Sequence, residues 1–294
     1  MKFFLAFVGT VCLMGGIHAQ IGNVATTVAS AISTSNANLA STIQSVNSTI
    51  VAADQIILSS YASFGNSMIN LFNSYYTKYQ TYTSIDLSPI TSAISNMQSM
   101  MTSQPQLMAG DSYNVQQIFT EVQTSAQQIQ DALNGAVTTM TNACGSNCAS
   151  TKAVKCANKF GGQLNSTTIT IDRVTACIAD EATRYTQIGA DTASQYTTSL
   201  TLATNYLLMD SMCDIPDATT LNNPSTTMGP LSTQCFSNYL QRFTNVPIYS
   251  YTTDIPRMTQ TQLISFRAKR CAKLVALDIT DRINQISAKY AACL

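Results

Sequence analysis

Residues able to perform acid–base or nucleophilic chemistry are scarce in this sequence. The single histidine, His18, lies inside residues 1–19, which have the charged start, apolar run and small-residue end of a secretory signal peptide. Without that segment the chain has no histidine for a Ser-His-Asp or Cys-His centre or for a histidine zinc site. It also shows no nucleotide-binding loop, hydrolase serine motif or calcium loop. We therefore predict a protein that is not an enzyme and has no catalytic, cofactor-binding or metal-binding residues.

The carboxylates that lie close together in sequence do not form a convincing catalytic pair. They fall into three groups: Asp180 with Glu181, Asp278 with Asp281, and Asp210 and Asp214 with Asp217. Consecutive residues on a helix point about 100° apart, and Asp278 and Asp281 share their helical face with Arg282. We expect the first two groups at the solvated surface. The third could bind a cation weakly, but a charged helix end is the simpler interpretation.

Cysteine is the residue type with the clearest pattern. After the signal segment an even number remains, all in the second half of the chain: Cys144, Cys148, Cys156, Cys177, Cys213, Cys235, Cys271 and Cys293. In an exported chain this predicts disulfides. Metal binding is the weaker alternative, because Cys144 and Cys148 have neither a second close pair nor a histidine beside them.

Helical geometry limits how these cysteines can pair. At ~1.5 Å per residue, Cys271 and Cys293 would lie roughly 33 Å apart on one helix, whereas a disulfide needs Cα atoms within about 7 Å. The bridges must therefore join different helices. We expect Cys156 to pair with Cys177 and Cys213 with Cys235, leaving Cys144 and Cys148 for Cys271 and Cys293, although other pairings remain open.

Charge divides the mature chain into two segments. Only 10% of the residues are charged, compared with about 25% in ordinary globular proteins. Residues 20–143 contain Lys78 as their one basic residue and form a low-charge, Ser/Thr-rich, amphipathic helical region; residues 144–294 form a cysteine-rich helical domain. Neither has the basic field that nucleic-acid binding requires. The local cluster from Arg267 to Lys273 is interpreted as a solvated helix face.

Apolar residues recur at helical spacing through most of the chain, which predicts an all-α fold. We expect an elongated bundle of long helices, coiled-coil-like in its first half and disulfide-linked in its second. One stripe in the first half is aromatic: Met68, Phe72, Tyr75, Tyr79 and Tyr82. It could bind a sugar or another flat ligand, but we expect it to pack against a partner helix. No later segment is apolar enough to span a membrane.

Capping residues and helix breakers predict where helices begin and end. Ser88-Pro89 should begin a helix, and Thr259 with Gln262 forms a capping box for the last one. Breaks are expected at three places: a loop around Gln104-Pro105 and Gly110, a turn at Gly161-Gly162, and a loop through Pro216, Pro224 and Pro230.

Two Asn-X-Thr sequons predict that the protein is a glycoprotein. They are Asn47-Ser48-Thr49 and Asn165-Ser166-Thr167. Asn165 lies just before an expected helix, where a glycan is easily carried. Asn47 lies beside the apolar stripe of its own helix, so its glycan would have less room.

The succession of a signal peptide, a low-charge Ser/Thr/Ala/Gln-rich helical region and a set of C-terminal cysteines ending near Cys293 resembles the TsetseEP-domain secreted proteins of insects. The Glu-Pro repeats of the protein that gave the family its name are missing. The resemblance implies an extracellular protein of the gut or another secretory epithelium. It provides no catalytic residues to carry over.

Three functions remain to be weighed. The first, which we favour, is a secreted structural or interaction protein that presents its helices to a protein or glycan partner or to itself. The second is an extracellular carrier that encloses a lipid or another apolar small molecule, suggested by the cluster of Met97, Met100 and Met101. The third is a hydrolase based on carboxylates, for which no credible pair is found.

Overall fold

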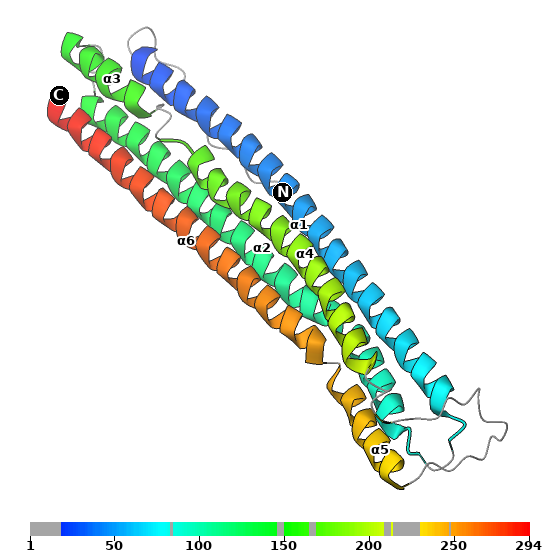
Figure 1. Ribbon diagram of the computed structural model, residues 1–294. Coiled ribbons are helices and arrows are strands. Elements are labelled where there is room, and N and C mark those ends of the chain that lie inside the picture. The colour runs from blue at the N-terminus through cyan, green and yellow to red at the C-terminus, as the bar shows by residue number, and fades with distance from the viewer. Residues whose placement is uncertain are drawn as a thin grey trace. The chain divides into compact units, whose positions relative to one another are not determined.

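The computed structural model describes residues 19–82, 85–145, 150–164, 169–208, 213, 230–246 and 248–294. The helices in this part of the chain are α1 (Ala19–Tyr79), α2 (Ser88–Cys144), α3 (Thr151–Leu164), α4 (Asp172–Leu207), α5 (Pro230–Asn245) and α6 (Ile248–Cys293), shown in Figure 1. No strand occurs in the same residues. The predicted all-α class is confirmed, and among the helices described none is long and apolar enough to cross a membrane.

The helical segments group into two compact units, and each is considered by itself. Unit 1 combines Met1–Val46, Gln117–Asp180 and Arg267–Leu294; unit 2 combines Asn47–Gln116 and Glu181–Phe266. Each unit takes segments from both the low-charge region and the cysteine-rich domain that the sequence suggests. The predicted signal peptide lies outside the described residues, apart from Ala19 at the start of α1.

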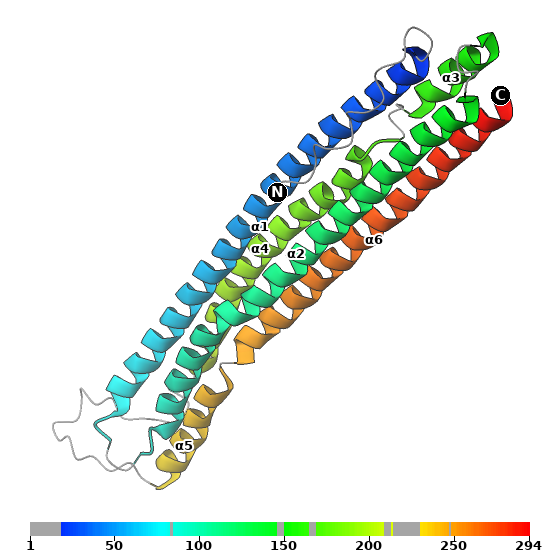
Figure 2. The ribbon, with the colours of Figure 1, turned by 180° about the vertical axis from the view of Figure 1, so that it is seen from behind.

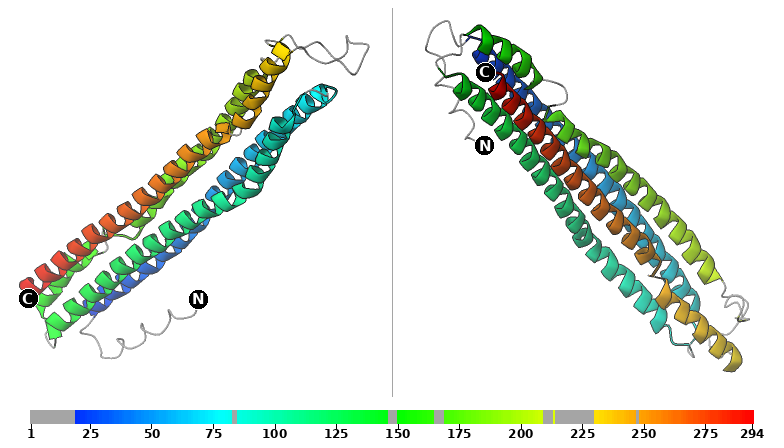
Figure 3. Two further views of the ribbon diagram at one scale, coloured as in Figure 1. Left: turned by 90° about the horizontal axis from the view of Figure 1, so that it is seen from below. Right: turned by 90° about the vertical axis from the view of Figure 1, so that its left-hand side faces the viewer.

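The core of unit 2 is rich in aromatic rings. Within this unit α4 and α6 form one layer and α1 and α2 the other (Figure 3). The predicted aromatic stripe is buried along its whole length, but α1 ends at Tyr79, so Tyr82 lies in the turn after the helix and not on its face. Its Tyr79 packs edge-on against Phe236 of α5 with 4.5 Å between ring centroids, and Tyr75 packs against Phe243 of α5 at 5.3 Å. The expectation that this stripe packs against a partner helix is therefore confirmed.

Disulfides tie the helices of unit 1 to one another. Cys156 of α3 is bonded to Cys293 of α6, and Cys177 of α4 to Cys271 of α6. In agreement with the first bond, Figures 1 and 2 both show α3 beside the C-terminal end of α6. Apolar side chains of α6 such as Ile279, Ile283 and Tyr290 fill the interior of this unit.

The start of α2 is where Ser88-Pro89 predicts it, but the capping group comes from another residue. The Asp86 carboxylate accepts hydrogen bonds from the Ser88 backbone N–H at 2.9 Å and the Ser88 hydroxyl at 2.8 Å. These two bonds, the backbone bond first, lower the pKa of Asp86. The carboxylate thus binds a backbone donor that the helix itself leaves unpaired.

Two predicted breaks are wrong, because packing keeps the chain helical through residues that usually interrupt helices. Helix α2 continues through Pro105 and Gly110, with Gln104 and Met108 buried on either side of the proline. Helix α3 continues through Gly161 and Gly162. A Cβ atom at Gly161 would lie 2.4 Å from Cγ2 of Val24, so this glycine allows α1 and α3 to approach closely and does not form a turn.

The predicted start of the last helix is also wrong. Helix α6 begins at Ile248, and the Thr259 hydroxyl donates within the helix to the Ile255 carbonyl at 3.0 Å, so it caps nothing. Pro230 is the first residue of α5, a position that suits proline because its missing N–H would have no helical partner there. Pro216 and Pro224 lie outside the described residues.

Candidate functional site

The first part of α6, Ile248–Phe266, belongs to unit 2 and buries polar side chains in place of apolar ones. Its inward residues are 0–4% exposed and follow helical spacing: Ser250, Thr253, Asp254, Arg257, Thr261 and Ser265. Among the side chains described in this segment, Ile264 is the one fully buried apolar residue. Apolar burial, the usual force that binds a helix to its bundle, is therefore small here.

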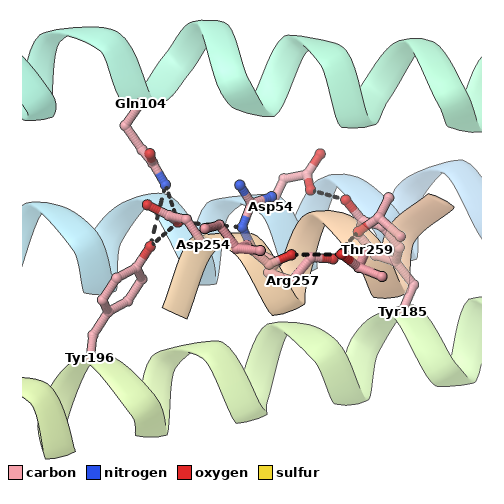
Figure 4. Close-up of polar contacts among 9 residues, drawn as sticks. Asp54, Gln104, Tyr185, Tyr196, Asp254, Arg257 and Thr259 are labelled. Carbon is pink, nitrogen blue, oxygen red and sulfur yellow. Dashed lines mark hydrogen bonds and ion pairs between the residues drawn. The ribbon is translucent and has the colours of Figure 1, made fainter. Parts of the chain in front are cut away.

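A network of hydrogen bonds joins this polar face to two neighbouring helices. Oδ1 of Asp254 accepts a hydrogen bond from the Tyr196 hydroxyl of α4 at 2.6 Å and another from Nε2 of Gln104 of α2 at 3.2 Å (Figure 4). The Gln104 amide also lies 3.4 Å from the Tyr196 hydroxyl. Nε of Arg257, one turn along α6, lies 3.6 Å from Oδ1 of Asp254. One carboxylate thus connects three helices.

The surroundings of Tyr196 keep its hydroxyl protonated. Its ring is buried between Tyr61, edge-on at 5.3 Å between centroids, and Phe64, stacked at 5.7 Å. Burial, and after it the negative charge of Asp254, raises the pKa of Tyr196 well above its ordinary value. The hydroxyl therefore remains a hydrogen-bond donor to Asp254 over the physiological pH range.

A second tyrosine–aspartate pair lies nearer the start of α4. The Tyr185 hydroxyl donates to Oδ1 of Asp54 on α1 at 2.5 Å (Figure 4). Tyr185 and Tyr196 are three helical turns apart and face the same interior. Together the two pairs attach α4 to α1 on one side and to α6 on the other, which fixes the axial position of α4 within unit 2.

The outward face of the same α6 segment carries three large apolar side chains and no charge. Ile255, Leu263 and Phe266 are 63%, 49% and 58% exposed. The other exposed residues of the segment are neutral: Thr252, Pro256, Thr259, Gln260 and Gln262. The segment is thus inverted relative to an ordinary surface helix, with charge inside and large apolar side chains outside. Such a surface is suited to binding another apolar surface.

The cysteines predicted to form disulfides do so wherever both partners are described. The expected pair Cys213–Cys235 is confirmed, with its Cα atoms 5.6 Å apart. The pair Cys156–Cys177 is wrong, as is the assignment of Cys271 and Cys293 to Cys144 and Cys148, because α6 lies beside α3 and α4 and takes both of their cysteines. Cys144 is disulfide-bonded, and Cys148 lies outside the described residues.

The other residues that the sequence singles out are spread over the helices. Asn47 is half-buried on α1, and Asn165 lies outside the described residues, as do Asp210, Asp214 and Asp217. Asp180 is exposed as expected, but Glu181 is buried and lies 3.6 Å from Arg184. Asp278 binds Arg173 at 3.0 Å and Arg282 at 3.1 Å. Within the described part of the chain, no cluster of His, Cys, Asp or Glu could hold a metal ion.

Sequence reasoning missed the inverted segment of α6. Ser250, Asp254, Arg257, Thr261 and Ser265 do follow helical spacing. Polar residues at that spacing usually mark a solvated face, however, and the same periodicity results when the polar face is inside. The available signal was the combination of this polar stripe with Ile255, Leu263 and Phe266 on the opposite side.

Comparison with protein-family models, curated protein sequences and solved structures found no match to this chain. Membership in the insect family that its architecture resembles therefore remains a prediction. The function must be argued from the residues themselves.

Proposed function

We propose that this protein is a secreted, non-catalytic structural or interaction protein that binds its partners through outward helical faces. The partner is another protein, a glycan or a second copy of the chain. The setting is extracellular, in keeping with the disulfides Cys156–Cys293, Cys177–Cys271 and Cys213–Cys235.

The observation that carries the proposal is the inverted polarity of Ile248–Phe266. The ionisable side chains of the network in and against this segment are Asp254, Arg257 and, from α4, Tyr196. They are nearly inaccessible to solvent and interact with one another. That arrangement suits the holding of helices in register better than it suits binding a substrate. The side chains offered to solvent are Ile255, Leu263 and Phe266, which favour contact with another macromolecule.

The alternative, a carrier of a lipid or another apolar molecule, has weaker support. A carrier would need the methionines of α2 to line a space for the ligand, but Met97 is completely buried. Close by, Met101 packs so tightly on α1 that a Cβ atom at Gly65 would lie 2.4 Å from its Sδ atom. These methionines serve to pack α1 against α2. Native mass spectrometry of the secreted protein tests the carrier directly, because a bound lipid would appear as a defined added mass.

Hydroxyl-radical footprinting tests the interaction proposal. The oxidation rates of Phe266 and Leu263 are measured by mass spectrometry in the native secretion and in dilute purified protein. We expect both side chains to react more slowly in the secretion because a partner covers them. Phe72, which is fully buried, serves as the internal control and should react slowly in both samples. Equal rates for Phe266 and Leu263 in the two samples would count against the proposal.

A further inference from the structure

We propose that the outward face of α6 formed by Ile255, Leu263 and Phe266, here called the α6 outer face, binds the same face of a second copy of the chain. This inference rests on the proposed function and names the partner of that site. Its starting point is that the described residues of unit 2 leave these three side chains about half exposed or more. The hydrogen bonds from Tyr196 and Gln104 to Asp254 hold the polar side of the helix inward, so the apolar side must point to solvent.

The three side chains lie on one side of the helix, where the exposed Thr259 and Gln262 also lie. At about 100° per residue, Phe266 lies about 20° around the helix from Ile255, and Leu263 lies about 60° from Phe266. The stripe is about 16 Å long, since Ile255 and Phe266 are separated by three turns at ~1.5 Å per residue. An antiparallel pairing of two such stripes about a two-fold axis would place Ile255 of one copy opposite Phe266 of the other. Leu263 would lie toward the middle of the contact.

The α6 outer face carries no charge, which favours a second copy of the chain over a charged partner. Every exposed residue between Thr252 and Phe266 is uncharged. A charged partner would therefore find no complementary group within the segment, and would leave its own charges desolvated. Two copies of a neutral apolar face meet without repulsion and bury the same kind of surface on each side.

The size of the face indicates how strong the association is. A stripe about 16 Å long and about 10 Å wide covers about 160 Å² on each copy, compared with about 800 Å² per partner in a stable complex. The pair should therefore be weak and reversible. We expect the dimer to form only toward the millimolar end of the concentration range.

Sedimentation velocity of the full secreted chain, from micromolar to millimolar concentration, tests this inference. The same measurement is made on two variants that place opposite charges at position 263. The unsubstituted protein should shift from monomer to dimer as its concentration rises. Leu263→Glu and Leu263→Lys should each remain monomeric, with at least a tenfold weaker association, because two like charges would meet near the axis. An equimolar mixture of the two variants should dimerise again. Leu202→Glu on α4, a substitution at another exposed leucine of unit 2, should leave the association unchanged.

Several results would overturn the inference. One is an unsubstituted chain that stays monomeric at millimolar concentration; another is dimerisation of Leu263→Glu alone, or none in the mixture. Monomers that bind vesicles of neutral phosphatidylcholine through Leu263 would assign the face to a lipid surface instead. Protection of Phe266 in the native secretion, combined with a strictly monomeric purified protein, would leave the proposed function standing and remove the second copy as the partner.

Discussion

The Tyr196 hydroxyl of α4 donates a 2.6 Å hydrogen bond to Asp254 of α6, a residue 58 positions further along the chain. Both side chains are almost completely buried. A carboxylate removed from water needs such donors, since an unpaired buried charge is costly. This bond, together with the amide of Gln104, explains how the polar face of α6 is accommodated inside unit 2.

Replacing Tyr196 with phenylalanine should destabilise the protein. The ring contacts with Tyr61 and Phe64 would remain, while Asp254 would lose its shortest hydrogen bond. We expect the free energy of unfolding to fall by about 1–3 kcal/mol, measured by urea denaturation. Tyr76→Phe, at a tyrosine at the surface of α1, is the matched control and should change stability by less than about 0.5 kcal/mol. Equal effects of the two substitutions would show that the hydrogen bond contributes nothing specific.

The free energy of unfolding should also decrease with rising pH in the alkaline range, because of Tyr196. Burial and the charge of Asp254 raise the pKa of this tyrosine in the folded state, so the folded protein holds the proton more tightly than the unfolded chain does. Its contribution is fully present below the unfolded pKa of about 10 and is lost as the pH rises above that value. Urea denaturation at several pH values from 8 to above 10 should therefore show a steeper decline for the unsubstituted protein than for Tyr196→Phe. Parallel curves would contradict this assignment.

The ion pair between Asp254 and Arg257 should be coupled energetically. Asp254→Leu alone would leave the buried Arg257 guanidinium beside an apolar side chain. The free energy of unfolding should then fall by about 3–5 kcal/mol. Adding Arg257→Met removes that charge, so the double variant should be more stable than the single one. A double-mutant cycle by chemical denaturation measures the coupling. Additive losses would indicate that the two side chains act independently.

The disulfide pattern can be tested without any substitution. Peptide mapping under non-reducing conditions should recover Cys156 with Cys293, Cys177 with Cys271, and Cys213 with Cys235. Removing the Cys177–Cys271 bond by a double serine substitution should lower the free energy of unfolding by about 4 kcal/mol, because the bond closes a loop with a sequence separation of 94 residues. Recovery of a peptide joining Cys156 to Cys177 would refute the pairing.

The surface carboxylate Asp278 should titrate below the usual range. The hydrogen bond from Arg173, and after it that from Arg282, lowers the pKa of Asp278. Its stabilising effect is therefore present above the unfolded pKa of about 3.9 and disappears as the pH falls through the lower folded value. Arg173→Gln should raise the pKa of Asp278 toward its ordinary value in an NMR titration, whereas Arg184→Gln, at an arginine paired with Glu181, should leave it unchanged.

Local sequence signals predicted much of the secondary structure. The apolar spacing of α1, its aromatic stripe as far as Tyr79 and the start of α2 at Ser88 follow from side-chain periodicity and capping, which act within a few residues. The helix breaks expected at Pro105 and Gly161 are wrong because the structure there depends on contacts with distant parts of the chain. There, neighbouring helices supply packing that exceeds the local preference to end a helix.

The candidate site could not be read from the sequence. Asp254 and Phe266 lie on opposite sides of α6. The spacing of polar and apolar residues along the chain indicates that the helix has two faces, but it does not indicate which face is buried. The same holds for Cys271, whose partner depends on which helix lies beside it. The sequence by itself determined that this chain forms long amphipathic helices. The tertiary structure decided their inward faces and their partners, because burial and pairing depend on contacts between residues far apart in the chain.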